Sequence, residues 1–179
     1  MRVIDVERTY LQLTSPPPET PFLAGDAPWS ALPAGVRIDE VCDCPVATYR
    51  ELYAAVGADY LWRDRLAWSD ETLAVHLARR DVRVWILCDA EGEGGYFELV
   101  KGGDGAVEIA YFGLVRTRHG RGLGKALLSR AIAESWGWGA TRVWLHTCTL
   151  DGPAALPNYI ARGFVPYRRE TYAVTLPDD

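Results

Sequence analysis

No apolar stretch of this 179-residue chain approaches the ~18 residues that a membrane-spanning helix needs. The first ten residues, MRVIDVERTY, mix charged with apolar side chains and do not resemble a signal peptide. Acidic residues outnumber basic ones, 24 against 19, which argues against a broad basic surface for nucleic acid or anionic lipid. These absences predict a cytoplasmic protein with no membrane or nucleic-acid partner.

Cysteine and histidine, which bind most transition metals in proteins, are scarce, with four and three copies. Cys42 and Cys44 form a C-x-C pair, but no second cluster accompanies it. Such a lone pair favours buried free thiols over a metal or redox site. No metal is therefore expected.

Acidic residues are missing entirely between Ile109 and Ala133, a window that holds five Arg and Lys residues. The net charge of the chain is −5, so the remainder carries −10. Within the window, RHGRGLGK (residues 118–125) precedes an apolar helical pattern. A helix start is already positive, so this segment predicts a bound phosphate or pyrophosphate. The alternative is a surface helix with a flexible loop before it and solvated charges.

Two common phosphate motifs are excluded by spacing. A P-loop needs Ser or Thr after its lysine, and Ala126 follows Lys125. A dinucleotide motif that began at Gly120 would need glycine at position 125, which is lysine.

The run His119-Gly120-Arg121-Gly122-Leu123-Gly124 resembles the Arg/Gln-x-x-Gly-x-Gly/Ala signature of the GCN5-related N-acetyltransferase (GNAT) superfamily. Histidine replaces the usual Arg or Gln in the first position. The resemblance implies that backbone amides bind the pyrophosphate of coenzyme A, and that acetyl-CoA is the co-substrate. It implies cofactor contacts from the strand and bend at Phe112, Leu114, Val115, Arg116, His119, Gly120, Arg121, Gly122, Leu123, Gly124 and Lys125.

Apolar periodicity and turn residues predict alternating strands and helices along the chain. Strands are expected at 3–13, 36–42, 82–88, 96–101, 106–115 and 142–149, with the last strands within 164–175; helices are expected at 45–56, 69–80, 122–136 and 154–162. From 36 to 175 this order resembles the GNAT fold, an α/β (α+β) fold with a mixed, largely antiparallel sheet flanked by helices. Residues 1–35 are expected to form a strand and a Pro-rich arm packed on the acyltransferase domain, residues 36–179.

Glu108 is the one charged residue in the apolar strand at 106–115. Strand alternation places it on the face of Ala110, Phe112 and Leu114. Desolvation would raise its pKa, which suits a base that takes the proton of an ammonium group. GNAT members with a base on this strand have a Glu at this place. The alternative is a structural ion pair with an arginine.

The segment Tyr159-Ile160-Ala161-Arg162-Gly163-Phe164 resembles the family's Tyr-x-x-x-Gly-Phe. The resemblance implies that the Tyr159 hydroxyl points at the sulfur of coenzyme A and protonates the departing thiolate. Pro157 is expected to interrupt the helix before this tyrosine. The alternative is a core aromatic residue with its hydroxyl at the surface.

Other polar residues have two interpretations each. His146 is either a second base or a hydrogen-bonded structural residue, and His76 is expected at the surface or in packing. The segment Tyr60 to Arg65 either selects the acceptor or forms a salt-bridged turn. The sequence shows no activated nucleophile; the alternative that stays open is Cys148, as a thiol in the cleft.

The sequence therefore predicts an N-acetyltransferase that moves an acetyl group from acetyl-CoA directly to a primary amine. Glu108 and Tyr159 are the expected catalytic residues. The acceptor is a small molecule or peptide, and the protein is a monomer or homodimer. The alternatives are a coenzyme-A-binding sensor without turnover, or an enzyme that uses another acyl-CoA.

Overall fold

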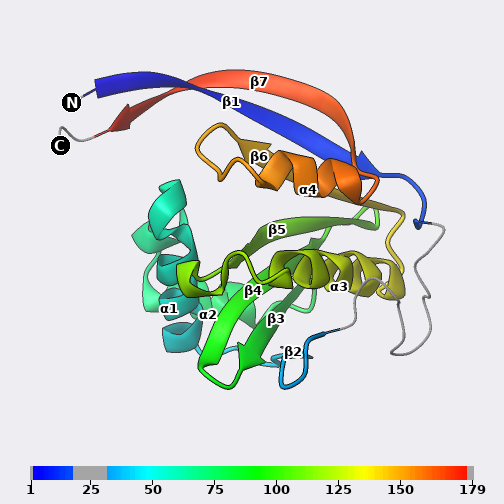
Figure 1. The fold of residues 1–179 in the computed structure, drawn as a ribbon. Coiled ribbons are helices and arrows are strands. Elements are labelled where there is room, and N and C mark those ends of the chain that lie inside the picture. The colour runs from blue at the N-terminus through cyan, green and yellow to red at the C-terminus, as the bar shows by residue number, and fades with distance from the viewer. Residues whose placement is uncertain (1, 18–31, 177–179) are drawn as a thin grey trace.

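A computed structural model describes residues 2–17 and 32–176. The predicted Pro-rich arm lies mostly outside these ranges. The chain forms one seven-stranded sheet in the order β2-β3-β4-β5-β6-β1-β7 (Figure 1). The strands are β1 (Arg2–Leu13), β2 (Arg37–Glu40), β3 (Val82–Asp89), β4 (Gly92–Lys101), β5 (Ala106–Leu114), β6 (Arg142–Cys148) and β7 (Val165–Leu176). The helices are α1 (Val46–Gly57), α2 (Asp70–Leu77), α3 (Leu123–Gly137) and α4 (Ala155–Ala161).

Helices cover both faces of the sheet and divide its core in two. The apolar stripe of α3 is buried as the periodicity predicts, with Leu127, Leu128 and Ile132 at 0% exposure against β4 and β5. On the opposite face, α1 and α2 bury Tyr49 and Leu73 against β3 and β4. The predicted mixed, helix-flanked sheet is confirmed.

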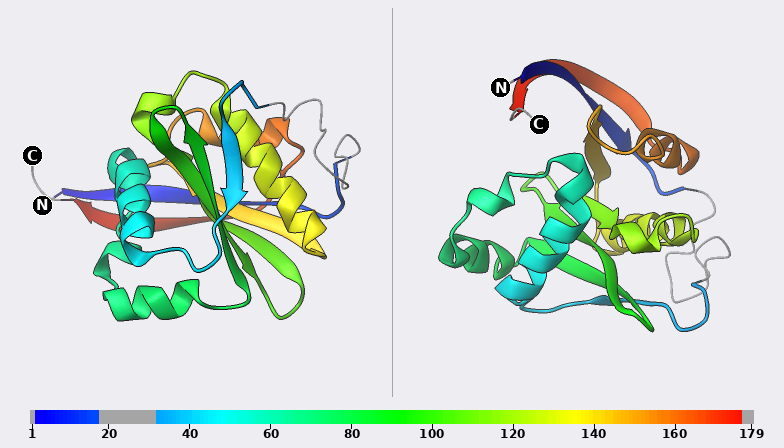
Figure 2. Two further views of the ribbon diagram at one scale, coloured as in Figure 1. Left: turned by 90° about the horizontal axis from the view of Figure 1, so that it is seen from below. Right: turned by 60° about the vertical axis from the view of Figure 1, so that its left-hand side comes forward.

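The sheet separates between β5 and β6, its one parallel pair. The two strands pair only over Ala106–Glu108 and Arg142–Trp144. Beyond Glu108 they diverge, and the molecule opens into two parts, with α1, α2 and α3 on one side and α4 on the other (Figures 1 and 2).

The N-terminal strand lies inside the sheet. β1 pairs with β6 over Arg8–Leu13 and with β7 over Arg2–Gln12, both antiparallel. The start of β1 and the end of β7 consequently lie side by side (Figure 1). The division into an N-terminal segment, residues 1–35, that packs on a domain of residues 36–179 stays a prediction.

Two details differ from the sequence prediction. The segment after Phe164 forms one strand, β7, rather than several. β4 begins at Gly92 instead of residue 96, because Gly94 and Gly95 lie within the strand. A Cβ at Gly95 would lie 2.6 Å from the carbonyl oxygen of Gly113, so glycine here permits a close approach of β5 rather than a turn.

Ser69 caps α2 as predicted, since its hydroxyl accepts a hydrogen bond from the Thr72 amide. None of the described helices is long and apolar enough to cross a bilayer.

Candidate active site

The bend before α3 requires glycine at two positions. Gly120 and Gly122 have φ angles of +75° and +76°, a left-handed region that disfavours side chains. Among the described residues, no hydrogen bond occupies the backbone amides from Gly120 to Gly124. These N–H groups and the start of α3 form a concentration of unpaired donors suited to an anion.

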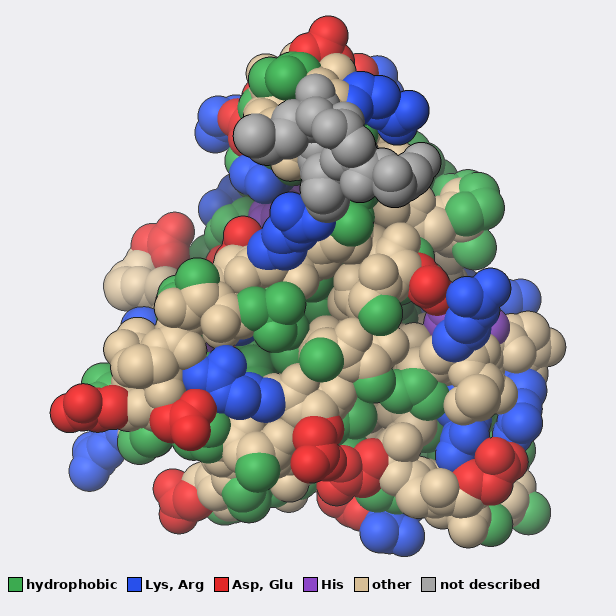
Figure 3. All heavy atoms as spheres, turned by 90° about the vertical axis from the view of Figure 1, so that its left-hand side faces the viewer, with side chains coloured by type: hydrophobic (Ala, Val, Ile, Leu, Met, Phe, Trp, Pro, Cys, Tyr) green, Lys and Arg blue, Asp and Glu red, His purple; other side chains and the backbone are tan. Residues whose placement is uncertain are grey.

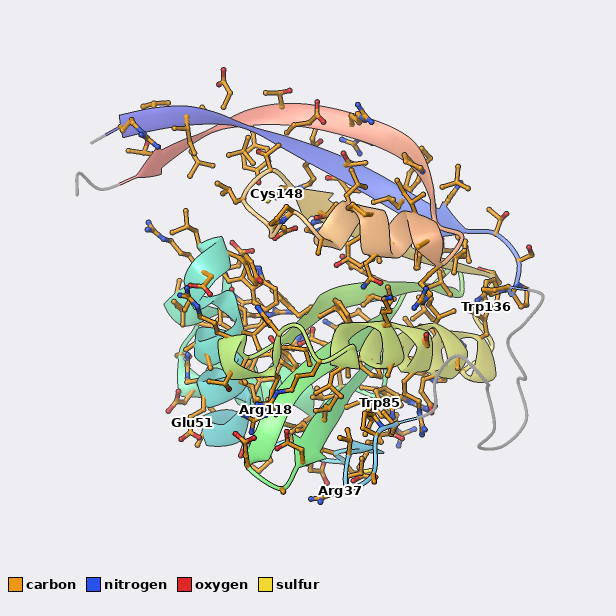
Figure 4. The ribbon with its side chains drawn as sticks, in the orientation of Figure 1. Arg37, Glu51, Trp85, Arg118, Trp136 and Cys148 are labelled. Carbon is orange, nitrogen blue, oxygen red and sulfur yellow. The ribbon has the colours of Figure 1, made fainter. Side chains whose placement is uncertain are left out.

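The charges around this bend are largely neutralised, which the sequence did not predict. Arg118 is buried at 4% exposure, with its Nε 2.7 Å from Asp89 and its Nη1 2.9 Å from Glu91. It reaches from the bend toward the β3–β4 hairpin (Figure 4). Arg121 also pairs with Glu91, at 3.1 Å, so both arginines join the bend to that hairpin.

Two further cations differ in their pairing. Arg116 lies 3.4 Å from Asp59 in an exposed ion pair. Lys125 has no ion pair with any described residue. The backbone and Lys125 therefore carry the anion-binding character of the bend, and the three arginines near it already have carboxylate partners.

His119 holds the bend against the end of β5. Its Nε2 lies 3.0 Å from the Leu114 carbonyl oxygen, so the ring N–H donates a hydrogen bond to that oxygen. This contact gives the histidine a structural role that does not depend on a ligand.

The β5 edge next to the separation has free backbone donors. The Val115 amide donates to the Gly94 carbonyl in β4, at 2.9 Å. Alternate residues of a strand direct their amides to opposite edges, so Phe112 and Leu114 point theirs toward the edge that β6 has left. An extended ligand could pair there as an added strand.

A cavity of about 1150 Å³ occupies the separation. Nine of the predicted site residues line it: Glu108, Phe112, Leu114, His119, Gly120, Gly122, Gly124, Lys125 and Tyr159. It leaves out Val115, Arg116, Arg121 and Leu123, the last of which is buried in the core. Seen from its open side, this part of the molecule has hydrophobic side chains and backbone near its centre, with charges of both signs around them (Figure 3).

The predicted face of Glu108 is wrong, because β5 contains a bulge. Glu98 pairs with Tyr111 and Leu99 with Ile109, so Ala110 is an extra residue that has no partner in β4. Alternation reverses at this point. Phe112 and Leu114 pack toward α3, whereas Glu108 shares the opposite face with Tyr111.

Glu108 is half-buried and makes no ion pair or side-chain hydrogen bond with the described residues. Burial, with a smaller contribution from the charge of Glu98, raises the pKa of Glu108 to about 7, although Arg65 opposes the shift. A carboxylate with this pKa is divided between its two protonation states at neutral pH, which suits proton transfer.

Tyr159 lies on the opposite side of the cavity, on α4. Pro157 does not interrupt this helix, because it occupies the first turn, where a backbone N–H has no helical partner. The Tyr159 ring packs against Phe112 and Phe164, with centroids 6.1 and 6.2 Å away. Burial, together with the charge of Asp151, raises its pKa, so the hydroxyl keeps its proton at neutral pH.

A buried polar cluster behind Glu108 is absent from the sequence prediction. Glu98 on β4 is 0% exposed and accepts three hydrogen bonds, from the Tyr49 hydroxyl at 2.5 Å, His76 at 2.8 Å and Arg65 at 2.9 Å. Burial by itself would raise the pKa of Glu98, but these donors lower it below its ordinary value. Of the two expectations for His76, surface or packing, the second is confirmed, because His76 is buried against the Glu98 carboxylate. The one available signal was a Glu within an apolar strand, as at Glu108.

The segment between α1 and α2 lines the same end of the cavity. The Arg65 guanidinium stacks on Trp68, 3.9 Å from the ring centroid, and lies 5.1 Å from that of Tyr111. Trp62 packs edge-to-face on Tyr111 at 5.1 Å. Arg65 forms a buried ion pair, and Tyr60 to Arg65 line the cavity. That this segment selects the acceptor stays a prediction.

His146 and Cys148 face the cavity from β6. The pKa of His146 is lowered, chiefly by desolvation and then by Arg8. Cys148 lies where β6 ends, above the separation (Figure 4). All four cysteines are free, but Cys42 is exposed, contrary to the expectation of buried thiols. The described residues hold no cluster of three or more metal-binding side chains.

The family model described as "Acetyltransferase (GNAT) family" matches residues 48–164. Three proteins named as uncharacterized N-acetyltransferases, from Mycobacterium bovis and two strains of Mycobacterium tuberculosis, are 34% identical over 104 residues. The match covers 57% of this chain and 61% of theirs, so it spans less than two thirds of those relatives.

Solved structures share the fold at low identity. A GCN5-related N-acetyltransferase from Kribbella flavida has a TM-score of 0.62 at 18% identity, over 93% of this chain and 56% of that one. An aminoglycoside acetyltransferase from an uncultured soil metagenomic sample, in complex with sisomicin, has a TM-score of 0.60 at 14% identity, over 72% and 87%.

Proposed function

The chain belongs to the acetyltransferase (GNAT) family, and from that premise we propose that it transfers an acetyl group from acetyl-CoA directly to a primary amine. Glu108 is the proposed general base and Tyr159 the proposed general acid. The observation that carries the proposal is their position on opposite walls of one cavity, next to a free strand edge and a bend of unpaired amides.

The residues present fit coenzyme A. Donors from Gly120 to Gly124, together with Lys125, would hold its pyrophosphate. The free amides of Phe112 and Leu114 would pair with the extended pantetheine arm. Bound acetyl-CoA would supply the acyl group as a thioester. Val115, Arg116, Arg121 and Leu123 remain proposed contacts only through their backbone or the rim, because they do not line the cavity.

Glu108 would prepare the acceptor. An amine with a pKa near 10.4 is mostly an ammonium ion at neutral pH and has no lone pair for attack. Ionised Glu108 would take that proton, directly or through one water, and its own pKa of about 7 leaves a large share of it in the basic form.

Tyr159 and the Phe112 amide would act on the other side of the reacting carbon. The Phe112 N–H would stabilise negative charge as it develops on the thioester oxygen. The Tyr159 hydroxyl, which keeps its proton, would donate it to the departing sulfur. Holding both reactants in one cavity would supply much of the rate through orientation.

The acceptor class stays open between a small amine and a peptide amine. The structural relative with sisomicin shares the fold at 14% identity, which carries no substrate to this chain. Cytoplasmic location and a monomeric or homodimeric state also stay predictions.

The proposal is tested in two steps. Acetyl-CoA should raise the melting temperature, and free thiol should then appear when a panel of small amines and peptides is added. Stabilisation without thiol release across the panel would favour the coenzyme-A sensor. Stronger stabilisation by succinyl- or longer acyl-CoA would favour another donor, and no binding of any thioester would overturn the proposal.

A further inference from the structure

Two carboxylates compete for one arginine at the acceptor end of the cavity. Glu98 and Glu108 lie on adjacent strands and on the same face of the sheet, and the Arg65 charge acts on both. Of these two carboxylates, Arg65 bonds to Glu98, at 2.9 Å, and the same guanidinium lies 3.2 Å from His76. Glu108 has no ionic partner among the described residues.

We infer that Glu98 is a positioning residue whose buried carboxylate holds the Arg65 guanidinium away from Glu108, so that Glu108 stays unpaired in the cavity. The inference rests on the proposed function in one respect: an unpaired Glu108 matters for catalysis only if Glu108 is the general base. The geometry itself is independent of any reaction.

The surroundings of Glu98 explain why Arg65 pairs with Glu98 rather than with Glu108. Glu98 is fully buried, and an ionised carboxylate without partners in that place would be strongly destabilising. Tyr49 and His76 satisfy part of its hydrogen-bonding capacity, and Arg65 supplies the compensating charge. Glu108 is less buried and can be solvated by water in the cavity, so it needs the arginine less.

Arg65 is also fixed from its other faces. Its guanidinium lies between Trp68 and Tyr111, at 3.9 and 5.1 Å from their ring centroids. Its Nε is buried and has no hydrogen-bond partner. An arginine with a free donor beside a half-buried carboxylate would pair with it if Glu98 no longer held it.

The consequence concerns the proton affinity of Glu108. An ion pair with arginine would lower the pKa of Glu108 and make it a weaker base. Glu98 therefore favours the basic role in two ways, through its own negative charge and through its hold on Arg65. Other titratable groups that line the same cavity include Arg8, Asp64, His76, Arg79, Tyr111 and His146.

The test is a pH titration of the Glu108 carboxyl carbon by ¹³C NMR of glutamate-labelled full-length protein, without substrate. The signal is assigned by its loss in Glu108→Gln. In Glu98→Gln, the midpoint should fall by about one pH unit or more. Tyr49→Phe removes a hydrogen bond to Glu98 and leaves every charge in place, so it should leave the midpoint almost unchanged.

A double-mutant cycle separates the hold on Arg65 from the charge of Glu98 alone. If Arg65 moves to Glu108 in Glu98→Gln, the shift should be clearly smaller when the same change is made in Arg65→Gln protein. Equal shifts in the two backgrounds would overturn the inference, as would no shift in either. Should Glu98→Gln not fold, Glu98→Asp withdraws the carboxylate by one methylene and should also lower the midpoint.

Failure of the proposed function would look different. If Glu108→Gln turned over like the parent enzyme, Glu108 would not be the base, while the titration result would still stand. If Glu108→Gln were inactive but Glu98→Gln left the Glu108 midpoint in place, only the role of Glu98 would be lost.

Discussion

The two halves of the cavity are built from different materials. The half next to α3 presents mainly backbone: the amides from Gly120 to Gly124 and the free edge of β5. The half next to α1 and α2 presents side chains that meet from separate elements, among them Glu108, Arg65 and Trp62. A site made of backbone depends on a few consecutive residues. A site made of side chains depends on which strands and helices pack together.

Replacing Glu108 should have the largest effect and separates the halves most clearly. Glu108→Gln should lower kcat/KM by roughly 10²- to 10⁴-fold, because the base is lost. Its thermal stabilisation by acetyl-CoA should remain, since the glycine bend is untouched. Thiol-release kinetics and melting curves measure the two quantities. Parent-like turnover would remove Glu108 from the mechanism.

Tyr159→Phe should lower kcat by roughly 10- to 100-fold, because the proposed general acid is lost. Affinity for coenzyme A should change little, because the ring keeps its packing on Phe112 and Phe164. Steady-state kinetics and calorimetry report the two values. Unchanged kcat would instead support a core role for the tyrosine.

Two glycine variants test the backbone half. Gly122→Ala forces a side chain into a left-handed conformation and should destabilise the free protein by about 1–2 kcal/mol. Gly124→Ala is the matched control: it lies within α3, and its Cβ would meet Leu114 at an ordinary 3.8 Å. It should be neutral or stabilising, by up to ~1 kcal/mol. Urea denaturation distinguishes them, and equal losses would contradict the backbone argument.

The smallest expected effect concerns pH and stability. The pKa of Glu108 is about 7 in the folded protein and lower, about 4.3, when unfolded. The folded state therefore binds more protons between these values, and Glu108 makes it less stable as pH rises through that window. The full pKa difference corresponds to about 2.5 kcal/mol between pH 5 and pH 8, and solvent screening of a half-buried carboxylate reduces it. Relative to the parent protein, Glu108→Gln should therefore gain on the order of 1 kcal/mol in the free energy of unfolding over this range. Urea titrations at both values measure it, and a difference independent of pH would refute the raised pKa.

The backbone half was largely predictable. The alternating glycines at 120 and 122 can be read directly from the sequence, and in the structure both have the positive φ that glycine favours. The unpaired amides follow from the helix start at Leu123. Even here the ion-pair partners of the arginines were not predictable. Arg118 is a buried partner of Asp89, which is 29 residues distant in the chain and meets it only because β4 and the β3–β4 hairpin bring it there.

The side-chain half was predictable only as single residues. Glu108 stood out as a charge in an apolar strand, but its face depended on the bulge at Ala110, which arises from pairing with β4. Glu98 has the same local signal. The role of Glu98 depends on its hydrogen bonds with Tyr49, Arg65 and His76, which lie on other elements.

The sequence by itself determined the order of strands and helices, the glycine bend and the stripe that α3 buries. These follow from periodicity and from backbone conformations that neighbouring residues set. Only the tertiary structure decided that β1 lies between β6 and β7, which face Glu108 occupies and which carboxylate holds Arg65. Hydrogen bonds and ion pairs act over a few ångströms, so their partners are chosen by the packing of segments that are far apart in the chain.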